Sequence, residues 1–171
     1  MEEGGRREDP VFDGLITLTA ISVFVTAVWM WKVHPLQNVY FNIFAGKNVI
    51  ARYDLDYWGL ANRRALEYIL QNDHSPVVTV GSDNAMSPLG YSFLMLKPED
   101  RERVRLGDDK RASDYVVTNH RFDTDIDNAK YRREYELFYE VRVDSELVLS
   151  VFKWKGGMSA AESSCAGDKV R

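Results

Sequence analysis

GLITLTAISVFVTAVWMW occupies residues 14–31 and carries no charge. As a helix with a rise of about 1.5 Å per residue, this run is about 27 Å long, close to the hydrocarbon thickness of a bilayer. Trp29 and Trp31 lie at its C-terminal edge, where indole rings favour the membrane interface. Residues 14–31 therefore predict one transmembrane helix.

A cleaved signal peptide is the main alternative for this run. Such a peptide has a basic start, a shorter apolar core and a cleavage site flanked by small residues. Residues 1–13 instead carry more acidic than basic residues, and Trp-Met-Trp stands where the cleavage site would lie. A buried core helix usually shows a polar stripe, whereas this run has only scattered Ser and Thr. We expect a retained anchor, preceded by a tail over residues 1–13.

Small hydroxyl residues line one face of the predicted helix at helical spacing: Thr19, Ser22 and Thr26. Small residues let a neighbouring helix approach closely, so this face is suited to packing against another membrane protein. The alternative is that each hydroxyl bonds to the carbonyl four residues earlier in the same helix. The sequence leaves both interpretations open.

The composition fits one globular domain beside the anchor. The chain has 171 residues, of which 45% are hydrophobic, enough for a packed core. A net charge of −4 argues against a nucleic-acid binder. The predicted membrane helix leads us to expect the lipid bilayer and other integral membrane proteins as partners. Cys165 is the one cysteine, which excludes an intramolecular disulfide. Basic residues flank the anchor on both sides, so charge alone leaves its orientation open.

Residues 32–155 combine helical and strand patterns, and we predict a small layered α/β domain. Apolar residues recur every three or four positions in residues 56–71, which predicts an amphipathic helix. A helix followed by a buried strand is typical of layered α/β domains. The predicted strands in this part are 77–80, 104–106 and 114–118, and the apolar run 89–96 is ambiguous.

The end of this domain gives the clearest strand signal. Tyr135, Val141 and Val143 belong to an apolar set that alternates with Glu and Arg, and a second apolar set follows Asp144-Ser145. This pattern predicts that the domain ends in a β-hairpin with a tight polar turn. The small residues of 156–171 predict a flexible C-terminal tail.

Four phrases follow the predicted membrane helix in order: HPLQNVYFNIFAG at 34–46, DLDYWG at 54–59, DYVVTNHR at 114–121 and FYEVRVDSELVLSVFKW at 138–154. Together they resemble the C-terminal part of bacterial multi-spanning glycosyltransferases of the protein-mannosyltransferase-like superfamily. Those enzymes use a polyprenyl-phosphate-linked sugar, and they end in a last transmembrane helix followed by an extracytoplasmic α/β domain. The resemblance covers roughly residues 14–155.

The resemblance implies a fold and a location, but no activity. It implies a protein of the bacterial inner (cytoplasmic) membrane with its C-terminal domain in the periplasm. The family's catalytic acidic residues lie in an early extracytoplasmic loop framed by many membrane helices, and no position of this chain matches them. Because the chain starts at Met1 with its own acidic tail, we interpret it as a separate protein without enzymatic activity.

Local motifs for catalysis or for a bound cofactor are missing from the sequence. His34, His74 and His120 are far apart, and we expect them in turns or on the surface. Gly81-Ser82-Asp83 leaves a predicted strand where α/β proteins often place ligands, but the further glycines of a nucleotide-binding loop are missing. We therefore predict no cofactor.

One acidic cluster has the carboxylate spacing of a calcium-binding loop. Asn128 stands where such a loop has glycine, and the preceding residues predict a strand where an EF-hand has a helix. Neighbouring Lys and Arg residues would also weaken cation binding. We therefore favour a solvated acidic loop over a metal site. The members of the cluster are Asp123, Asp125, Asp127 and Glu134.

Two functions fit these features. The first is a non-catalytic single-pass subunit that packs in a larger membrane protein complex and caps its extracytoplasmic side, for example in a respiratory, photosynthetic or transport assembly. The second, which the resemblance implies, is an accessory or glycan-binding module working with a lipid-linked-sugar glycosyltransferase. Exposed aromatic residues would favour the second function, although we expect its three candidates to pack in the core. These candidates are Tyr53, Tyr57 and Trp58.

Overall fold

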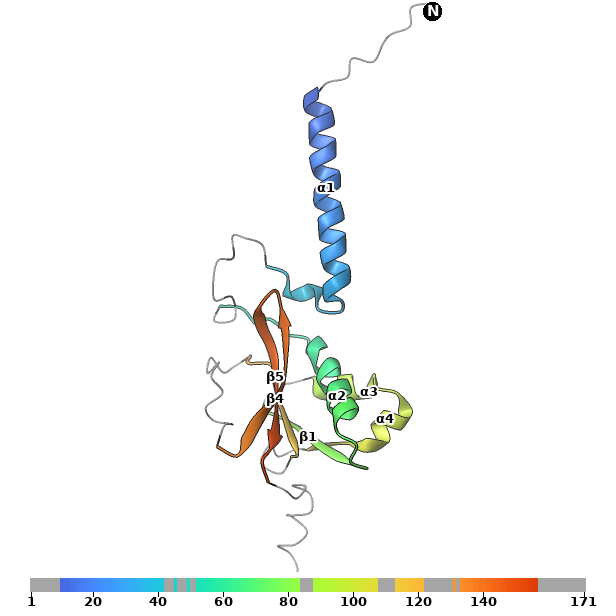
Figure 1. Ribbon diagram of the computed structural model, residues 1–171, viewed down its shortest axis with the longest axis vertical. Coiled ribbons are helices and arrows are strands. Elements are labelled where there is room, and N and C mark those ends of the chain that lie inside the picture. Colours follow the sequence, from blue (N-terminus) through green and yellow to red (C-terminus); the bar gives the residue numbers. More distant parts are fainter. Residues whose placement is uncertain are drawn as a thin grey trace, which may run out of the picture. The chain divides into compact units, whose positions relative to one another are not determined.

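The computed structural model describes residues 10–41, 45, 49, 52–83, 88–107, 113–121, 131 and 133–156. The chain divides into two compact units, Met1–Gln37 and Asn38–Arg171. The first contains helix α1 (Pro10–Val33), and the second contains an α/β domain (Figure 1). A short 3₁₀ helix, η1 (Gln37–Val39), lies where the two units join in the sequence.

Helix α1 has 24 residues, and none of them is buried. It extends beyond the uncharged run 14–31 at both ends, because Pro10 and Asp13 suit the first turn of a helix and Lys32 suits the last turn. At about 1.5 Å per residue its length is about 36 Å. In the part of the chain that the structure describes, α1 is the one helix long and apolar enough to cross a membrane. The predicted apolar helix is confirmed.

The α/β domain is built on a sheet of five described strands in the order β2-β1-β3-β5-β4. Strand β1 pairs in parallel with β2 and β3, while β5 pairs antiparallel with β3 and β4. The α/β class is therefore confirmed, with a parallel half joined to the final hairpin. The strand bounds are Val78–Ser82 (β1), Val104–Gly107 (β2), Tyr115–Thr118 (β3), Tyr135–Val143 (β4) and Glu146–Trp154 (β5).

Helices α2 (Leu60–Asn72), α3 (Leu89–Leu94) and α4 (Pro98–Arg103) lie on the same side of the sheet (Figure 1). Helix α2 buries an apolar stripe against the strands, as its periodicity predicts. Tyr68 adds a stacked contact with Tyr139 of β4, with ring centroids 3.8 Å apart. The buried apolar residues of α2 are Ala61, Ala65, Leu66, Ile69 and Leu70.

The predicted hairpin forms from β4 and β5, with Asp144 and Ser145 in the turn. Both turn residues have positive φ, 48° and 75°, as a two-residue turn of this hand requires. The alternation expected along β4 fails at Leu137, which is exposed, because the register shifts between Leu137 and Tyr139. Strand β5 is buried on both faces from Leu147 to Phe152, since α2 covers one face and an aromatic cluster covers the other.

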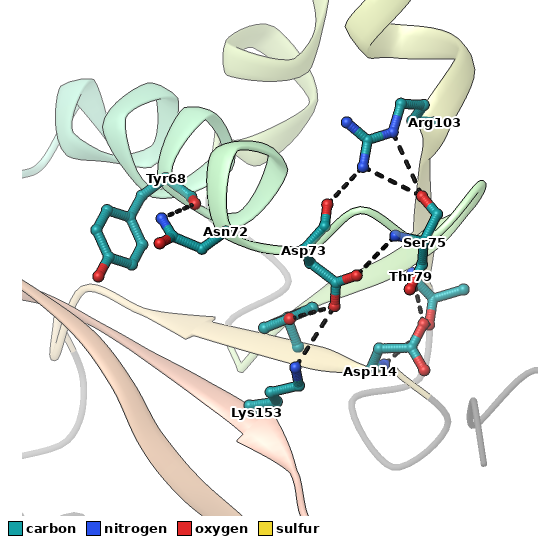
Figure 2. A network of polar contacts seen from close by, with 9 residues as sticks. Tyr68, Asn72, Asp73, Ser75, Thr79, Arg103, Asp114 and Lys153 are labelled. Atoms are coloured by element: carbon teal, nitrogen blue, oxygen red, sulfur yellow. Dashed lines mark hydrogen bonds and ion pairs between the residues drawn. The ribbon is translucent and has the colours of Figure 1, made fainter. Parts of the chain in front are cut away.

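A partly buried carboxylate connects the end of α2 to the sheet (Figure 2). The Asp73 carboxylate accepts hydrogen bonds from the Ser75 N–H (2.9 Å) and the Tyr115 hydroxyl (2.6 Å), and the Lys153 ammonium lies 3.5 Å away. Burial by itself would raise the pKa of the Asp73 carboxyl, but these partners outweigh it and hold the pKa well below its usual range. Burial and the Asp73 carboxylate together raise the pKa of Tyr115.

Two further polar contacts close the same end of the domain (Figure 2). The Arg103 guanidinium at the end of α4 donates to the carbonyl oxygens of Leu70, Asp73 and Ser75. Leu70 lies in the last turn of α2, where backbone carbonyls have no partner within the helix, and the other two residues follow that turn. Asp114 accepts hydrogen bonds from the N–H and the hydroxyl of Thr79, at 2.8 and 2.6 Å, and so joins the starts of β1 and β3.

We predict that Asp73→Asn lowers the free energy of unfolding at pH 7 by about 1–3 kcal/mol, because charged hydrogen bonds are lost. The folded-state pKa of Asp73 is depressed, so its stabilising contribution is present above the unfolded pKa of about 4 and is lost as the pH falls below it. The difference between the two proteins should therefore shrink on acidification. Urea unfolding of the full chain in detergent at several pH values measures this.

Glu67→Gln is the matched control, because the Glu67–Arg63 ion pair on α2 is exposed and should contribute no more than about 0.5 kcal/mol. Equal pH dependence of the Asp73→Asn variant and the wild type would contradict the assignment of this contribution to Asp73.

Candidate functional site

The predicted membrane-contact residues all lie on α1. Trp31 is 83% exposed within its unit, in the last turns of the helix. The Thr19 hydroxyl donates to the carbonyl of Leu15 at 2.8 Å, so the intrahelical interpretation holds for this residue. A role of the face formed by Thr19, Ser22 and Thr26 in helix packing stays a prediction, as does an interfacial role of Trp29 and Trp31.

Other predicted site residues are dispersed or fall outside the description. Asp123, Asp125 and Asp127 lie outside the described residues, and Glu134 is an exposed residue just before β4. Among the described residues, no group of three His, Cys, Asp or Glu side chains is placed to hold a metal ion.

The three histidines differ in exposure. His34 and His74 are exposed, whereas His120 is buried in the segment that follows β3. His120 has a φ of 57°, and its Nε2 lies 3.0 Å from the Ser150 hydroxyl oxygen. Ser150 is fully buried within β5, which keeps its hydroxyl away from any substrate. The pair therefore joins β3 to β5 and does not form a nucleophile–base arrangement open to solvent.

The carboxyl ends of β1 and β3 bring together segments that are far apart in the sequence. From β1 the chain crosses to β2 on one side and then to β3 on the other, so a topological switch point lies between β1 and β3. Ligands of open α/β sheets bind at such points. The Asp83 N–H donates to the Val117 carbonyl at 3.2 Å, which places the predicted exit 81–83 beside the residues that follow β3.

Residues 54–59 are held at this edge by polar contacts to the segment after β3. The Asn119 amide donates to the Asp56 carbonyl at 3.3 Å, and Arg121 Nε donates to the Asp54 carboxylate at 3.3 Å. The sequence singled out 81–83 but missed Asn119 and Arg121. The phrase DYVVTNHR contained both residues, but nothing in its pattern assigned them a partner.

Asp56 sets the start of α2 as well as the position of this segment. Its two carboxylate oxygens accept hydrogen bonds from the N–H groups of Leu60 and Ala61, at 2.8 and 2.9 Å. Burial raises the pKa of the Asp56 carboxyl, and these backbone donors offset the rise only in part. The predicted helix 56–71 therefore begins at Leu60, because Asp56 caps it from outside.

The aromatic residues of this segment face solvent, so the prediction that they pack in the core is wrong. Tyr53, Tyr57 and Trp58 are 48%, 47% and 70% exposed, and we refer to them as the aromatic patch. Leu55 and Asp56 take the buried positions between them. The Tyr57 and Trp58 rings meet edge to face at 5.1 Å, and the Arg121 guanidinium lies 4.0 Å from the Tyr57 ring centroid.

This arrangement is suited to binding and contains no evident reaction centre among the described residues. Flat aromatic rings stack on apolar surfaces of a ligand or insert at a polar–apolar boundary. Arg121 and Asp54 add a cation and a carboxylate beside the rings. The Asp73 network lies at the other end of the parallel strands, and we expect it to stabilise the fold.

Comparisons of the chain with protein-family models, with curated proteins and with solved structures find no match. The glycosyltransferase-like origin of the domain therefore stays a prediction.

Gly59 joins the aromatic patch to α2 in a conformation that other residues rarely adopt, with φ 64°. A Cβ there would lie 2.4 Å from Pro88 Cγ and 2.6 Å from Asn62 Nδ2. We expect Gly59→Ala to destabilise the domain by about 2 kcal/mol or more through strain and overpacking. Thermal unfolding of the full chain in detergent measures this effect.

Gly90→Ala is the control, because a Cβ at Gly90 in α3 meets no atom within 4 Å. It should be neutral or stabilise by up to about 1 kcal/mol. Equal stability of the two variants would contradict the left-handed conformation and the close packing at Gly59.

Proposed function

We propose that this protein is a non-catalytic, single-pass membrane subunit that packs in a larger membrane protein complex and covers its extracytoplasmic side. The observation that carries the proposal is α1: 24 residues with no charge between Asp13 and Lys32 and no buried side chain. An apolar helix without a buried residue is suited to an apolar environment, and a bilayer supplies one.

The face of α1 that carries Thr19 and Ser22 supports packing against a neighbouring helix. A shallow hollow lies over Leu15, Ile16, Thr19 and Ala20, where small side chains lower the helix surface. Lipid tails are as apolar as the helix, so close packing of small residues is what favours helix association in a membrane. A periplasmic position of the domain in a bacterial inner membrane rests on the family resemblance.

The test is purification of the full chain through a C-terminal affinity tag in a mild detergent, with mass spectrometry of the bound proteins. We expect stoichiometric integral membrane proteins. Ser22→Leu should reduce their recovery, because the larger side chain separates the helices. Phe24→Leu is the control, since it lies about 200° around the helix from Ser22. Recovery of the chain alone from native membranes would contradict the proposal.

A second candidate function is a glycan-binding module that works with a lipid-linked-sugar glycosyltransferase. The exposure of the aromatic patch supports it, because sugar rings stack on exposed aromatic faces. Arg121 and Asp54 are placed to hydrogen-bond ring hydroxyls beside Tyr57.

We expect maltotetraose or chitotetraose to change the tryptophan emission of the full chain under this second function. Trp58→Ala should weaken the affinity about tenfold or more, as loss of an aromatic contact does, and titration calorimetry measures this because the variant lacks the reporting tryptophan. Tyr91→Ala is the control, because Tyr91 is an exposed aromatic residue on α3. The titration requires a detergent without a sugar headgroup. An unchanged emission with both oligosaccharides would contradict the glycan-binding function.

A further inference from the structure

Exposed aromatic side chains of the domain are concentrated in the segment that follows α1. Among the described residues after Gln37, five aromatic side chains are exposed, and four of them lie between positions 40 and 58. The fifth, Tyr91, belongs to α3. The four are Tyr40 and the aromatic patch. Such a concentration is not needed for folding, because none of these side chains contributes to the buried core.

Covalent connectivity keeps this segment close to the end of α1. Asn38 follows Val33 by five residues, which span at most about 18 Å even when fully extended. The Asn38 amide then donates to the Leu55 carbonyl at 3.3 Å, which joins the start of the domain to the patch segment. The chain between α1 and the segment that carries Tyr57 and Trp58 is therefore short, which limits how far that segment can lie from the helix end.

The chemistry of the segment matches the boundary between lipid headgroups and hydrocarbon. Trp and Tyr favour this boundary because each has an apolar ring with a polar tip. Two guanidinium groups accompany the rings: Arg121 lies 4.0 Å from the Tyr57 centroid, and Arg52 lies 5.7 Å from the Tyr53 centroid. The exposed Arg52 guanidinium can lie in the headgroup layer while the neighbouring rings reach the acyl chains, whereas Arg121, whose side chain is 13% exposed, holds the Tyr57 ring in place.

We propose that Tyr40 and the aromatic patch insert into the interfacial layer of the bilayer and hold the domain against the membrane surface. This inference rests on the proposed function, since it requires α1 to span the same membrane. It assigns the exposed aromatics to lipid, and a glycan on the same rings is the competing outcome. Tyr91 and Leu94 of α3 and the following Met95 are also exposed, but they lie more than 50 residues after the end of α1 along the chain, and the proposal does not include them.

The chain supplies its own probes, because its four tryptophans are Trp29, Trp31, Trp58 and Trp154. Three full-length variants each keep one tryptophan and replace the others with Phe. They retain Trp31 in α1, Trp58 in the patch, or Trp154 in β5. Each is reconstituted in phosphatidylcholine vesicles whose acyl chains are brominated either near the carbonyl end or near the methyl end, and the loss of emission is measured.

We expect shallow bromines to quench Trp58 to an extent comparable with Trp31, and Trp154 to remain largely unquenched. Quenching of Trp31 but not of Trp58 would overturn the inference and leave the proposed anchoring intact. Absence of quenching at Trp31 would overturn the anchoring, and the inference with it. If bromolipid leaves the Trp58 emission unchanged but chitotetraose or maltotetraose changes it, the patch binds a glycan instead of lipid.

A second measurement avoids the loss of packing that Trp154→Phe causes beside Tyr135. The wild-type chain is labelled with fluorotryptophan and reconstituted with a lipid that carries a paramagnetic group at its headgroup. The fluorine signal of Trp58, assigned from Trp58→Phe, should broaden, while that of Trp154 should stay sharp. A sharp Trp58 signal beside a broadened Trp31 signal would overturn the inference independently of the variants.

Discussion

The two hydrogen bonds from the N–H groups of Leu60 and Ala61 to the Asp56 carboxylate are the contacts on which the organisation of the domain depends. They satisfy two of the N–H groups that every helix start leaves without intrahelical partners. They also hold a buried carboxyl group, and together with the Asn38 side chain and the Gly59 N–H they offset part of the cost of removing it from water. Asp56 and its neighbour Leu55 are buried here, whereas the following Tyr57 and Trp58 face outward.

A second carboxylate, Asp73, holds the opposite end of α2. Its partners come from β3 and β5, and the Arg103 guanidinium connects the same end to α4 (Figure 2). Helix α2 is thus attached at both ends, while its middle is held by apolar burial against the sheet. The two ends differ in what they leave exposed. The Asp73 end uses its polar groups on internal contacts, whereas the Asp56 end presents aromatic rings to solvent, with the largely buried Arg121 guanidinium against the Tyr57 ring.

This difference connects the fold to the proposed role. The domain contains a rigid polar end that stabilises it and an aromatic end that is available to a partner. The aromatic end is also the one that the chain connects closely to α1, through the contact of Asn38 with Leu55. Membrane anchoring and surface contact would therefore come from neighbouring parts of one chain. The sheet acts as a scaffold, and hydrogen bonds between residues 53–58 and 119–121 fix the position of one segment against the other.

The sequence by itself determined the elements that depend on local pattern: the uncharged run of α1, the apolar stripe of α2 and the polar turn at Asp144-Ser145. These follow from hydrophobic period, helix length and turn chemistry, all of which operate within a few residues. Only the tertiary structure decided that Tyr53, Tyr57 and Trp58 are exposed and that His120 is buried beside Ser150. The contacts responsible join residues 63 and 67 positions apart at the patch and 30 positions apart at His120. Local patterning carries no information about which distant backbone will meet an aromatic side chain, so its exposure is decided by the fold.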